Sequence, residues 1–277
     1  MTSLAPAVAA FVLVFAGLFG LVIGSFLNVV VYRVPAGIPL TRESRCGHCA
    51  APVRPWQNVP VASWLALRAR CASCAAPISA RYPLVELATA LAFVLVTWTA
   101  VDAWAGMQSP AVVTVTVAYL YLAAISIVLT LVDLDTRRLP NAIVLPGYVV
   151  LGVLFTLACV FGAPWEALLR SAIGGAGLFA FYLLLRALGR GGMGGGDVKL
   201  AGVLGLALGW IGWGALLVGA FAAFLLGGVY GVILMITRRA GRKSAIPFGP
   251  WMIAGVWVGI FTGDAVSQWY IGMLIAG

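Results

Sequence analysis

The stretch IVLTLVDLDTRRLPN, residues 127–141, closes an apolar run that starts near residue 110. The run has no charged residue before Asp133, and a helix that crosses a bilayer needs roughly 20 mostly apolar residues. Two arginines, Arg137 and Arg138, follow directly. The stretch therefore predicts a transmembrane helix that places a carboxylate at its end, beside a basic loop.

The rest of the chain is also largely apolar. Of its 277 residues, 63% are hydrophobic and only 9% are charged, and the mean hydropathy is +1.08. Soluble domains have about 45–50% apolar and about 25% charged residues. We predict an all-α polytopic membrane protein with about eight transmembrane helices and a cytoplasmic four-cysteine insert. The eight segments are 8–32, 83–102, 110–132, 142–162, 167–187, 198–213, 214–236 and 250–275.

Two alternatives to this fold are disfavoured. A closed barrel would need short strands that alternate apolar and polar residues, and these runs do not alternate. The first segment continues through GSFLNVVVYRVP without a small-residue cleavage pattern, which indicates a retained helix rather than a removed signal peptide. We divide the chain into a first transmembrane helix (1–32), an insert (33–82) and a transmembrane core (83–277).

The basic residues predict the orientation. Sixteen of the 17 fall in four segments, 33–82, 133–141, 186–199 and 237–249, and only Arg170 lies near the other side. Basic residues concentrate in cytoplasmic loops. The net charge of +9 is therefore attributed to topology and to contact with anionic lipid head groups. Nucleic-acid binding is not expected, because no soluble basic domain is available to carry it.

The insert contains two cysteine pairs, Cys46 and Cys49 in CGHC and Cys71 and Cys74 in CASC, with 21 residues between them. Four thiolates at such spacing are typical of a structural, four-coordinate zinc site. Two disulfides are disfavoured in a reducing cytoplasm, and free or redox-active cysteines are the other alternative. His48, inside the first pair, is interpreted as an exposed polar residue.

Two carboxylates are expected at similar depth on different helices. Asp133 ends the third segment, and Asp197 opens the sixth, after the glycine run of GGMGGGDVKL (191–200). Paired carboxylates in a low dielectric share a proton, so one can activate water while the other stabilises an oxyanion. No HExxH motif is present, and the only histidine lies between two cysteines.

Each acidic residue also has a simpler interpretation. Asp135 is explained as a solvated charge next to arginines, and Asp197 could be a helix N-cap. The neighbouring Gly194, Gly195 and Gly196 favour a functional role for Asp197, because they let another backbone approach closely. We expect this loop to admit an extended peptide. Lys199 is expected to extend to the membrane interface.

The sequence resembles the type IV prepilin peptidases, the bifunctional leader peptidase/N-methyltransferases of type IV pilus and type II secretion systems. The resemblance covers nearly the whole chain. The matching blocks are GSFLNVVVYRVP (24–35), the paired CxxC, WQNVPVASWLALRARC (56–71), ISARYPLVELATA (78–90), DLDTRRLPN (133–141), GGMGGGDVKL (191–200) and IPFGP (246–250).

The resemblance implies that Asp133 and Asp197 are the catalytic pair of a GxGD-type aspartic endopeptidase in the bacterial inner membrane. Asp133 is preferred over Asp135 because the family's aspartate stands seven residues before the LP proline, here Pro140. The enzyme would cut prepilins or pseudopilins at the cytoplasmic face and methylate the new N-terminus with S-adenosylmethionine. Where many relatives have aspartate, this chain has Asn141.

The methyl-donor pocket is not marked by any motif. Polar residues in the matching blocks are candidates: Asn28, Arg33, Asn58, Arg81 and Glu86. Glu86 could instead pair with Arg81 across one helical turn. Two other functions fit the carboxylates alone: an intramembrane GxGD protease without methyltransferase activity, and a proton-coupled transporter. The cysteine insert favours the prepilin enzyme, and no internal repeat typical of transporters is found.

Overall fold

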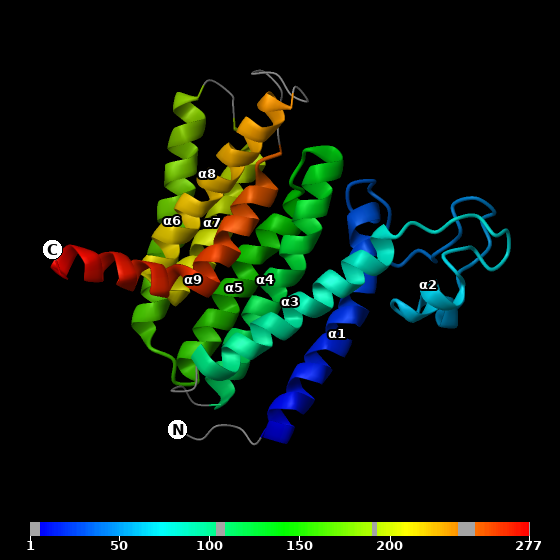
Figure 1. Cartoon of the computed structure of the whole chain (residues 1–277), viewed down its shortest axis with the longest axis horizontal. Coiled ribbons are helices and arrows are strands. Elements are labelled where there is room, and N and C mark those ends of the chain that lie inside the picture. Colours follow the sequence, from blue (N-terminus) through cyan, green and yellow to red (C-terminus); the bar gives the residue numbers. More distant parts are fainter. Residues whose placement is uncertain (1–5, 104–108, 190–192, 238–246, 277) are drawn as a thin grey trace. The chain divides into compact units, whose positions relative to one another are not determined.

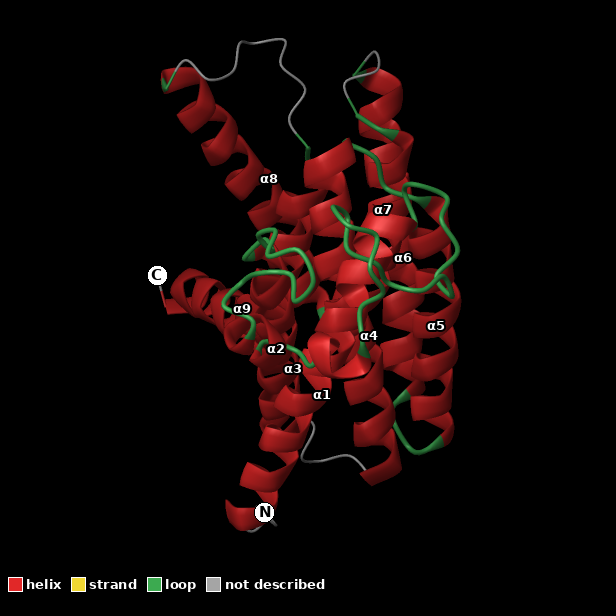
Figure 2. Cartoon of the chain, turned by 90° about the vertical axis from the view of Figure 1, so that its right-hand side faces the viewer, coloured by secondary structure: helices red, strands yellow, loops and turns green. Residues whose placement is uncertain are grey.

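The structure, a computed structural model, describes residues 6–103, 109–189, 193–237 and 247–276. All eight predicted segments are helices (Figure 1), and the described residues contain only loops besides helices and two isolated bridges (Figure 2). The long helices are α1 (Pro6–Arg33), α3 (Arg81–Ala103), α4 (Ser109–Thr136), α5 (Asn141–Val160), α6 (Trp165–Leu188), α7 (Gly195–Ile211), α8 (Trp213–Ile236) and α9 (Gly249–Ala276).

Six of these helices are long and apolar enough to cross a membrane: α1, α3, α4, α5, α6 and α8. Helix α7 has 17 residues, and eleven of them are buried by neighbouring helices, which marks it as a core element. The predicted break between the sixth and seventh segments is confirmed, because Gly212 alone separates α7 from α8. The chain is a multi-pass helical membrane protein.

The chain divides into two compact units. The first comprises the chain up to Gly106 together with Tyr119–Val128, and the second comprises Met107–Ala118 and Leu129–Gly277. Helix α4 contributes to both, and its last turn, which carries Asp133, belongs to the second unit. Some predicted features lie outside the described residues: Gly191 and Gly192 of the glycine run, Arg190, Ile246, and the basic residues Arg238, Arg239, Arg242 and Lys243.

Glycines set the helix packing in the first unit. Helices α1 and α3 lie side by side (Figure 1). A Cβ at Gly20 would lie 2.7 Å from the Ala90 Cα, and one at Gly24 would lie 2.6 Å from the Glu86 Cα. Small residues spaced by four let two helix backbones approach closely in a membrane, where packing rather than the hydrophobic effect drives association.

The same device joins two helix pairs in the second unit. Between α6 and α7, a Cβ at Gly174 would lie 2.7 Å from the Gly205 carbonyl oxygen. Between α8 and α9, a Cβ at Gly255 would lie 2.7 Å from the Gly219 oxygen, and one at Gly259 would lie 2.6 Å from the Ala215 oxygen. These contacts fix the register of α7 and α9, whose first turns form the site described next.

The predicted insert lies between α1 and α3 and has little regular structure. It contains a 3-10 helix, η1 (Pro55–Asn58), and a short α2 (Ala62–Ala66). No residue of η1 or α2 is buried. A segment without a hydrophobic core needs other constraints to hold a shape, and the insert has two, which are polar anchors on α1 and α3 and a cluster of four cysteines.

Candidate active site and cysteine cluster

Asp133 lies in the last turn of α4 and points into the second unit. Its side chain is 5% exposed, and the Gly249 backbone N–H donates a hydrogen bond of 3.1 Å to Oδ2. The neighbouring Leu134 and Asp135 are exposed. Burial therefore separates the two aspartates of DLD, since only Asp133 is inside the bundle, held by the first turn of α9.

Asp197 lies in the first turn of α7, one residue before the apolar segment predicted at 198–213. Its Oδ2 accepts a hydrogen bond of 3.1 Å from the Gly194 N–H, so it partly caps the helix start. Burial, and then the negative charge of Asp133, raise the pKa of Asp197 to about 6. The structure thus brings the two predicted carboxylates within electrostatic reach of each other.

Leu139 connects the two carboxylate-bearing turns. A Cβ at Gly196 would lie 2.9 Å from the Leu139 Cβ, and one at Gly249 would lie 2.8 Å from Asp133 Oδ2 and 3.5 Å from Leu139 Cδ2. A Cβ at Gly195 would lie 2.5 Å from Arg186 Nη1. The glycines beside Asp197 therefore admit two of the chain's own side chains, Leu139 and Arg186.

Two hydrogen bonds hold the start of α7 against α5. Lys199 Nζ donates to Asn141 Oδ1 over 3.0 Å, and the Tyr148 hydroxyl donates to the Lys199 carbonyl over 2.6 Å. The Lys199 ammonium therefore has an acceptor within the fold, at an exposed position, and its extension to the membrane interface stays a prediction. The sequence feature that could have indicated this partner is Asn141, whose side-chain amide directly follows the LP pair.

The first unit contains the four predicted cysteines in one cluster. The Sγ atoms of Cys46, Cys49, Cys71 and Cys74 all lie within 4.8 Å of one another, and the Cys46–Cys74 distance is 3.9 Å. A tetrahedral zinc with Zn–S bonds of about 2.3 Å separates its sulfurs by about 3.8 Å, so this donor set fits. His48 is exposed and lies outside the cluster.

The two halves of the cluster are built alike, in the repeated sequence RCxxCAAP. Arg45 forms an isolated backbone β-bridge with Pro52, and Arg70 forms one with Pro77. The backbone N–H of the first cysteine in each pair donates to an alanine carbonyl oxygen, at 2.9 Å for Cys46 and 2.8 Å for Cys71. Repetition of one turn thus aims both thiol pairs at the same point.

The thiols do not ionise alike. The backbone N–H groups of Cys49 and His48 lower the pKa of Cys46 to about 6. The Ala76 N–H lowers the pKa of Cys74, but its neighbours, first Cys49, together raise it to about 12. Four thiolates so close together need a cation to ionise together.

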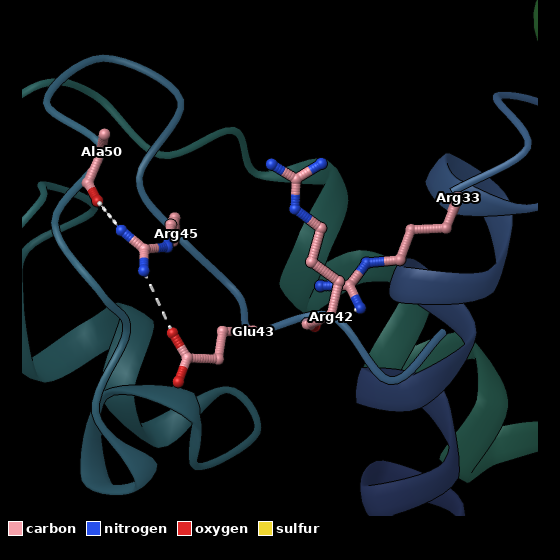
Figure 3. Close-up of polar contacts among 5 residues, drawn as sticks. All are labelled: Arg33, Arg42, Glu43, Arg45 and Ala50. Atoms are coloured by element: carbon pink, nitrogen blue, oxygen red, sulfur yellow. Dashed lines mark hydrogen bonds and ion pairs between the residues drawn. The ribbon is translucent and has the colours of Figure 1, made fainter. Parts of the chain in front are cut away.

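Arg33 is the first polar anchor of the insert. It ends α1, is 7% exposed, and its guanidinium donates to the carbonyl oxygens of Pro39 at 3.4 Å, Leu40 at 2.8 Å and Arg42, and to Ser44 Oγ at 3.3 Å. Figure 3 shows the Arg33 side chain extending toward the loop that carries Arg42. Further along this loop, Arg45 forms an ion pair with Glu43 at 3.2 Å and donates a hydrogen bond to the Ala50 carbonyl oxygen at 3.5 Å. Arg33 thereby fixes where the insert leaves the helix.

Glu86 is the second anchor, and sequence reasoning assigned it no such partner. It lies on α3, is 7% exposed, and accepts a hydrogen bond of 2.7 Å from the Val61 N–H. Val61 has φ 59° and ψ −50°, and the Ala62 N–H bonds the Pro60 oxygen. This is a strained γ-turn, which a β-branched residue adopts rarely. Of the other polar candidates, Asn58 and Arg81 are exposed, and Asn28 on α1 donates a hydrogen bond of 3.2 Å to the Tyr82 carbonyl oxygen.

We predict that Glu86→Ala loosens the insert, because it leaves the N–H of this strained turn without its buried acceptor. Loss of such a partner costs about 1–3 kcal/mol. Glu86→Gln keeps an acceptor oxygen and serves as the matched control. Hydrogen exchange at Val61 and the rate of tryptic cleavage in 54–70 should rise for the alanine variant only. Equal protection in both variants would show that the anchor is unimportant.

Two protein families and several known proteins match this chain over most of its length. Residues 18–100 match the bacterial Peptidase A24 N-terminal domain, and residues 120–232 match the type IV leader peptidase family. The prepilin leader peptidase/N-methyltransferase of Aeromonas hydrophila is 37% identical, with 92% of each chain covered. Those of Pseudomonas aeruginosa, 35% identical over 92% of this chain and 91% of its own, and Neisseria gonorrhoeae, 36% identical over 92% and 93%, bear the same name. No solved structure matches this chain.

Proposed function

The chain belongs to the type IV leader peptidase family, and on that premise we propose that it removes the leader of prepilins and N-methylates the new amino terminus. The observation that supports the peptidase activity is the pairing of Asp133, buried in the last turn of α4, with Asp197, half-buried in the first turn of α7. The two carboxylates interact electrostatically. Their roles, and that of the glycine loop, are part of this proposal.

Asp133 and Asp197 act as one acid–base unit. Two carboxylates that interact in a poorly solvated site share a proton across a range of pH. The ionised member takes a proton from water as the water oxygen attacks the scissile carbonyl carbon. The protonated member donates to the carbonyl oxygen, and on collapse of the tetrahedral adduct a proton passes to the leaving amine. The hydrogen bond from Gly249 to Asp133 and that from Gly194 to Asp197 keep both carboxylates oriented.

Arg186 and Leu139 lie at the approach to this pair of carboxylates. Arg186 lies against Gly195 and Leu139 against Gly196, both in the first turn of α7. The Arg186 contact is made by the far end of a flexible side chain, whereas the Leu139 contact is made by a Cβ that no rotamer change moves. Displacement of the Arg186 guanidinium, with no Cβ at Gly194, Gly195 and Gly196, opens a path for an extended peptide to reach Asp197.

The orientation of the chain brings the site to its substrates. Sixteen of 17 basic residues fall in four segments that face the same side if all eight long helices cross the bilayer, and basic residues concentrate in cytoplasmic loops. This supports our proposal that the dyad lies at the cytoplasmic face of the bacterial inner membrane. Prepilins and pseudopilins are the substrates, anionic lipid surrounds the basic loops, and nucleic acid is not a partner.

A structural zinc ion accounts for the cysteine cluster. Cys46, Cys49, Cys71 and Cys74 would hold it with four thiolates, which leaves no open coordination position for chemistry. The ion would supply the cation that offsets their charge and would replace the core that the insert lacks. We therefore propose a division into the first helix (1–32), the zinc-binding insert (33–82) and the peptidase core (83–277).

S-adenosylmethionine is the expected methyl donor, as the name of the relatives implies. Among the described residues, the cavity beside Tyr182 holds about 10 Å³, far below the several hundred Å³ of a typical small-molecule site. This cavity is therefore too small to hold the methyl donor.

The test is incubation of purified protein with a prepilin and S-adenosylmethionine, read by mass spectrometry. We expect a shortened product that carries one added methyl group. Asp133→Asn and Asp197→Asn should each lower the cleavage rate by about 10²–10⁴-fold, because either change removes the shared proton system. Asp135→Asn is the control and should keep most of the activity. Normal cleavage by either dyad variant would refute the assignment, and a cut but unmethylated product would reduce the protein to a peptidase.

Metal analysis tests the insert separately. Purified protein should contain about one zinc ion per chain. Cys46→Ser or Cys71→Ser should lower this content and expose the insert to trypsin, since metal binding contributes directly to folding of such a segment. Cys159→Ala, which changes a buried cysteine outside the cluster, should leave the zinc content unchanged. Metal-free protein with an equally protected insert would contradict the proposal.

A further inference from the structure

A tyrosine on α6 stands close to the dyad without having been assigned any role. Tyr182 is 2% exposed. Its ring packs against Phe224, with centroids 5.5 Å apart, and Phe248, with centroids 6.3 Å apart. Phe248 directly precedes Gly249, whose N–H binds Asp133. The Tyr182 ring is thus wedged between α8 and the turn that orients the first carboxylate.

The packing of α6 on α7 places Tyr182 opposite the second carboxylate. The two helices are consecutive, antiparallel and in extensive contact (Figure 1). Gly174 lies against Gly205, and one turn further along, Leu178 and Ala201 line the same cavity. Helices of equal rise keep this register. Four residues further toward the end of α6, and four residues back toward the start of α7, this register places Tyr182 opposite Asp197.

Two further contacts agree with this register. Arg186, one turn beyond Tyr182 on the same face of α6, lies against Gly195, the residue that begins α7. Tyr182 itself lines the cavity together with Ala201 and Leu204, which share a helix face with Asp197 at spacings of four and seven residues. The side chain of Tyr182 therefore projects toward the α7 turn that carries Asp197.

The polar atom of Tyr182 is available for this neighbour. The negative charge of Asp197 acts electrostatically on the Tyr182 hydroxyl. A phenol is both a donor and an acceptor, and a buried phenol usually finds a partner. A carboxylate is acceptor-only when ionised, so the charged form of Asp197 is the complementary group.

We propose that the Tyr182 hydroxyl is a positioning donor for the dyad, which hydrogen-bonds the Asp197 carboxylate when the peptidase is in its reactive state. The donor favours ionised Asp197 over its protonated form and holds the carboxylate oxygen toward the attacking water. No bond to substrate is made or broken by the phenol. This inference rests on the proposed peptidase function.

Other charged or titratable groups also surround Asp197. From the elements packed against α7 they are Asp133 of α4, Tyr148 of α5 and Arg186 of α6, with Lys199 on α7 itself. Lys199 is bound to Asn141, and Tyr148 donates to the Lys199 carbonyl. Helix α9 has no titratable residue between Gly249 and Phe261, and the titratable residue of α8 is Tyr230, whose ring packs against Trp251. Tyr182 is therefore the neutral donor that remains for Asp197.

Steady-state cleavage of a prepilin by Tyr182→Phe is the test, with the full-length protein in detergent. The variant keeps the ring and removes only the hydroxyl. A hydrogen bond to a charged group is strong, so kcat should fall about 10- to 100-fold with KM near the wild-type value. The acidic limb of the kcat profile should move to higher pH, because ionised Asp197 loses a donor. Tyr230→Phe is the matched control, because the Tyr230 ring also packs against an aromatic side chain, Trp251, with centroids 4.6 Å apart. This variant should change neither kcat nor the pH profile.

The outcomes separate this inference from the proposed function. Wild-type protein that fails to cleave prepilin refutes the function. A wild type that cleaves, an inactive Asp197→Asn, and a Tyr182→Phe with unchanged kcat and pH profile overturn the role of Tyr182. Should Tyr182→Phe lower the unfolding temperature, 3-fluorotyrosine at position 182 replaces it, because this residue keeps ring and hydroxyl and donates more strongly. The acidic limb should then move to lower pH, and an unmoved limb would overturn the proposal.

Discussion

Everything in the second unit depends on keeping two acidic side chains together inside an apolar bundle. Burying a carboxylate is costly unless donors or a shared proton compensate. The fold supplies a backbone donor for each, Gly249 for Asp133 and Gly194 for Asp197. Each donor comes from the first turn of a helix or the residue before it, where backbone N–H groups lack intrahelical partners. Close helix packing through glycines determines where these turns lie. A side chain added at Gly205 would displace α7 together with Asp197, and one added at Gly255 would displace α9 together with the Gly249 N–H.

The first unit solves a different problem with similar means. An insert of about fifty residues has no buried residue in its two short helices, so polar anchors and thiols must give it shape. Arg33 gathers carbonyl groups where the chain leaves α1, and Glu86 holds the strained turn at Val61 just before α2. Both anchors sit on transmembrane helices. The insert is therefore tied to the membrane part by buried charges at two points, and the cysteine cluster fixes its distal end.

Much of this could be predicted from sequence, and the rest could not for a physical reason. Apolar runs predicted the positions of all eight long helices, and six of these are long and apolar enough to cross a membrane. Cysteine spacing predicted the cluster, and the flanking arginines and LP pair separated Asp133 from Asp135. Sequence reasoning missed the Glu86–Val61 and Lys199–Asn141 hydrogen bonds and the packing of Tyr182 against Phe224 and Phe248. Each of these contacts joins residues far apart along the chain. Such contacts depend on helix register, which the glycines determine only once partners are known.

The account requires that Asp133 and Asp197 lie side by side in the working protein. Paired cysteines measure this most directly. Asp133→Cys and Asp197→Cys are combined in a Cys159→Ala background with the insert cysteines protected by zinc, and the protein is treated with a short bifunctional thiol-reactive cross-linker. We predict a cross-linked peptide between the two positions in high yield, and far less when Asp135→Cys replaces Asp133→Cys. Complete single modification at both sites without a cross-link, or equal yields from the two pairs, would contradict the account.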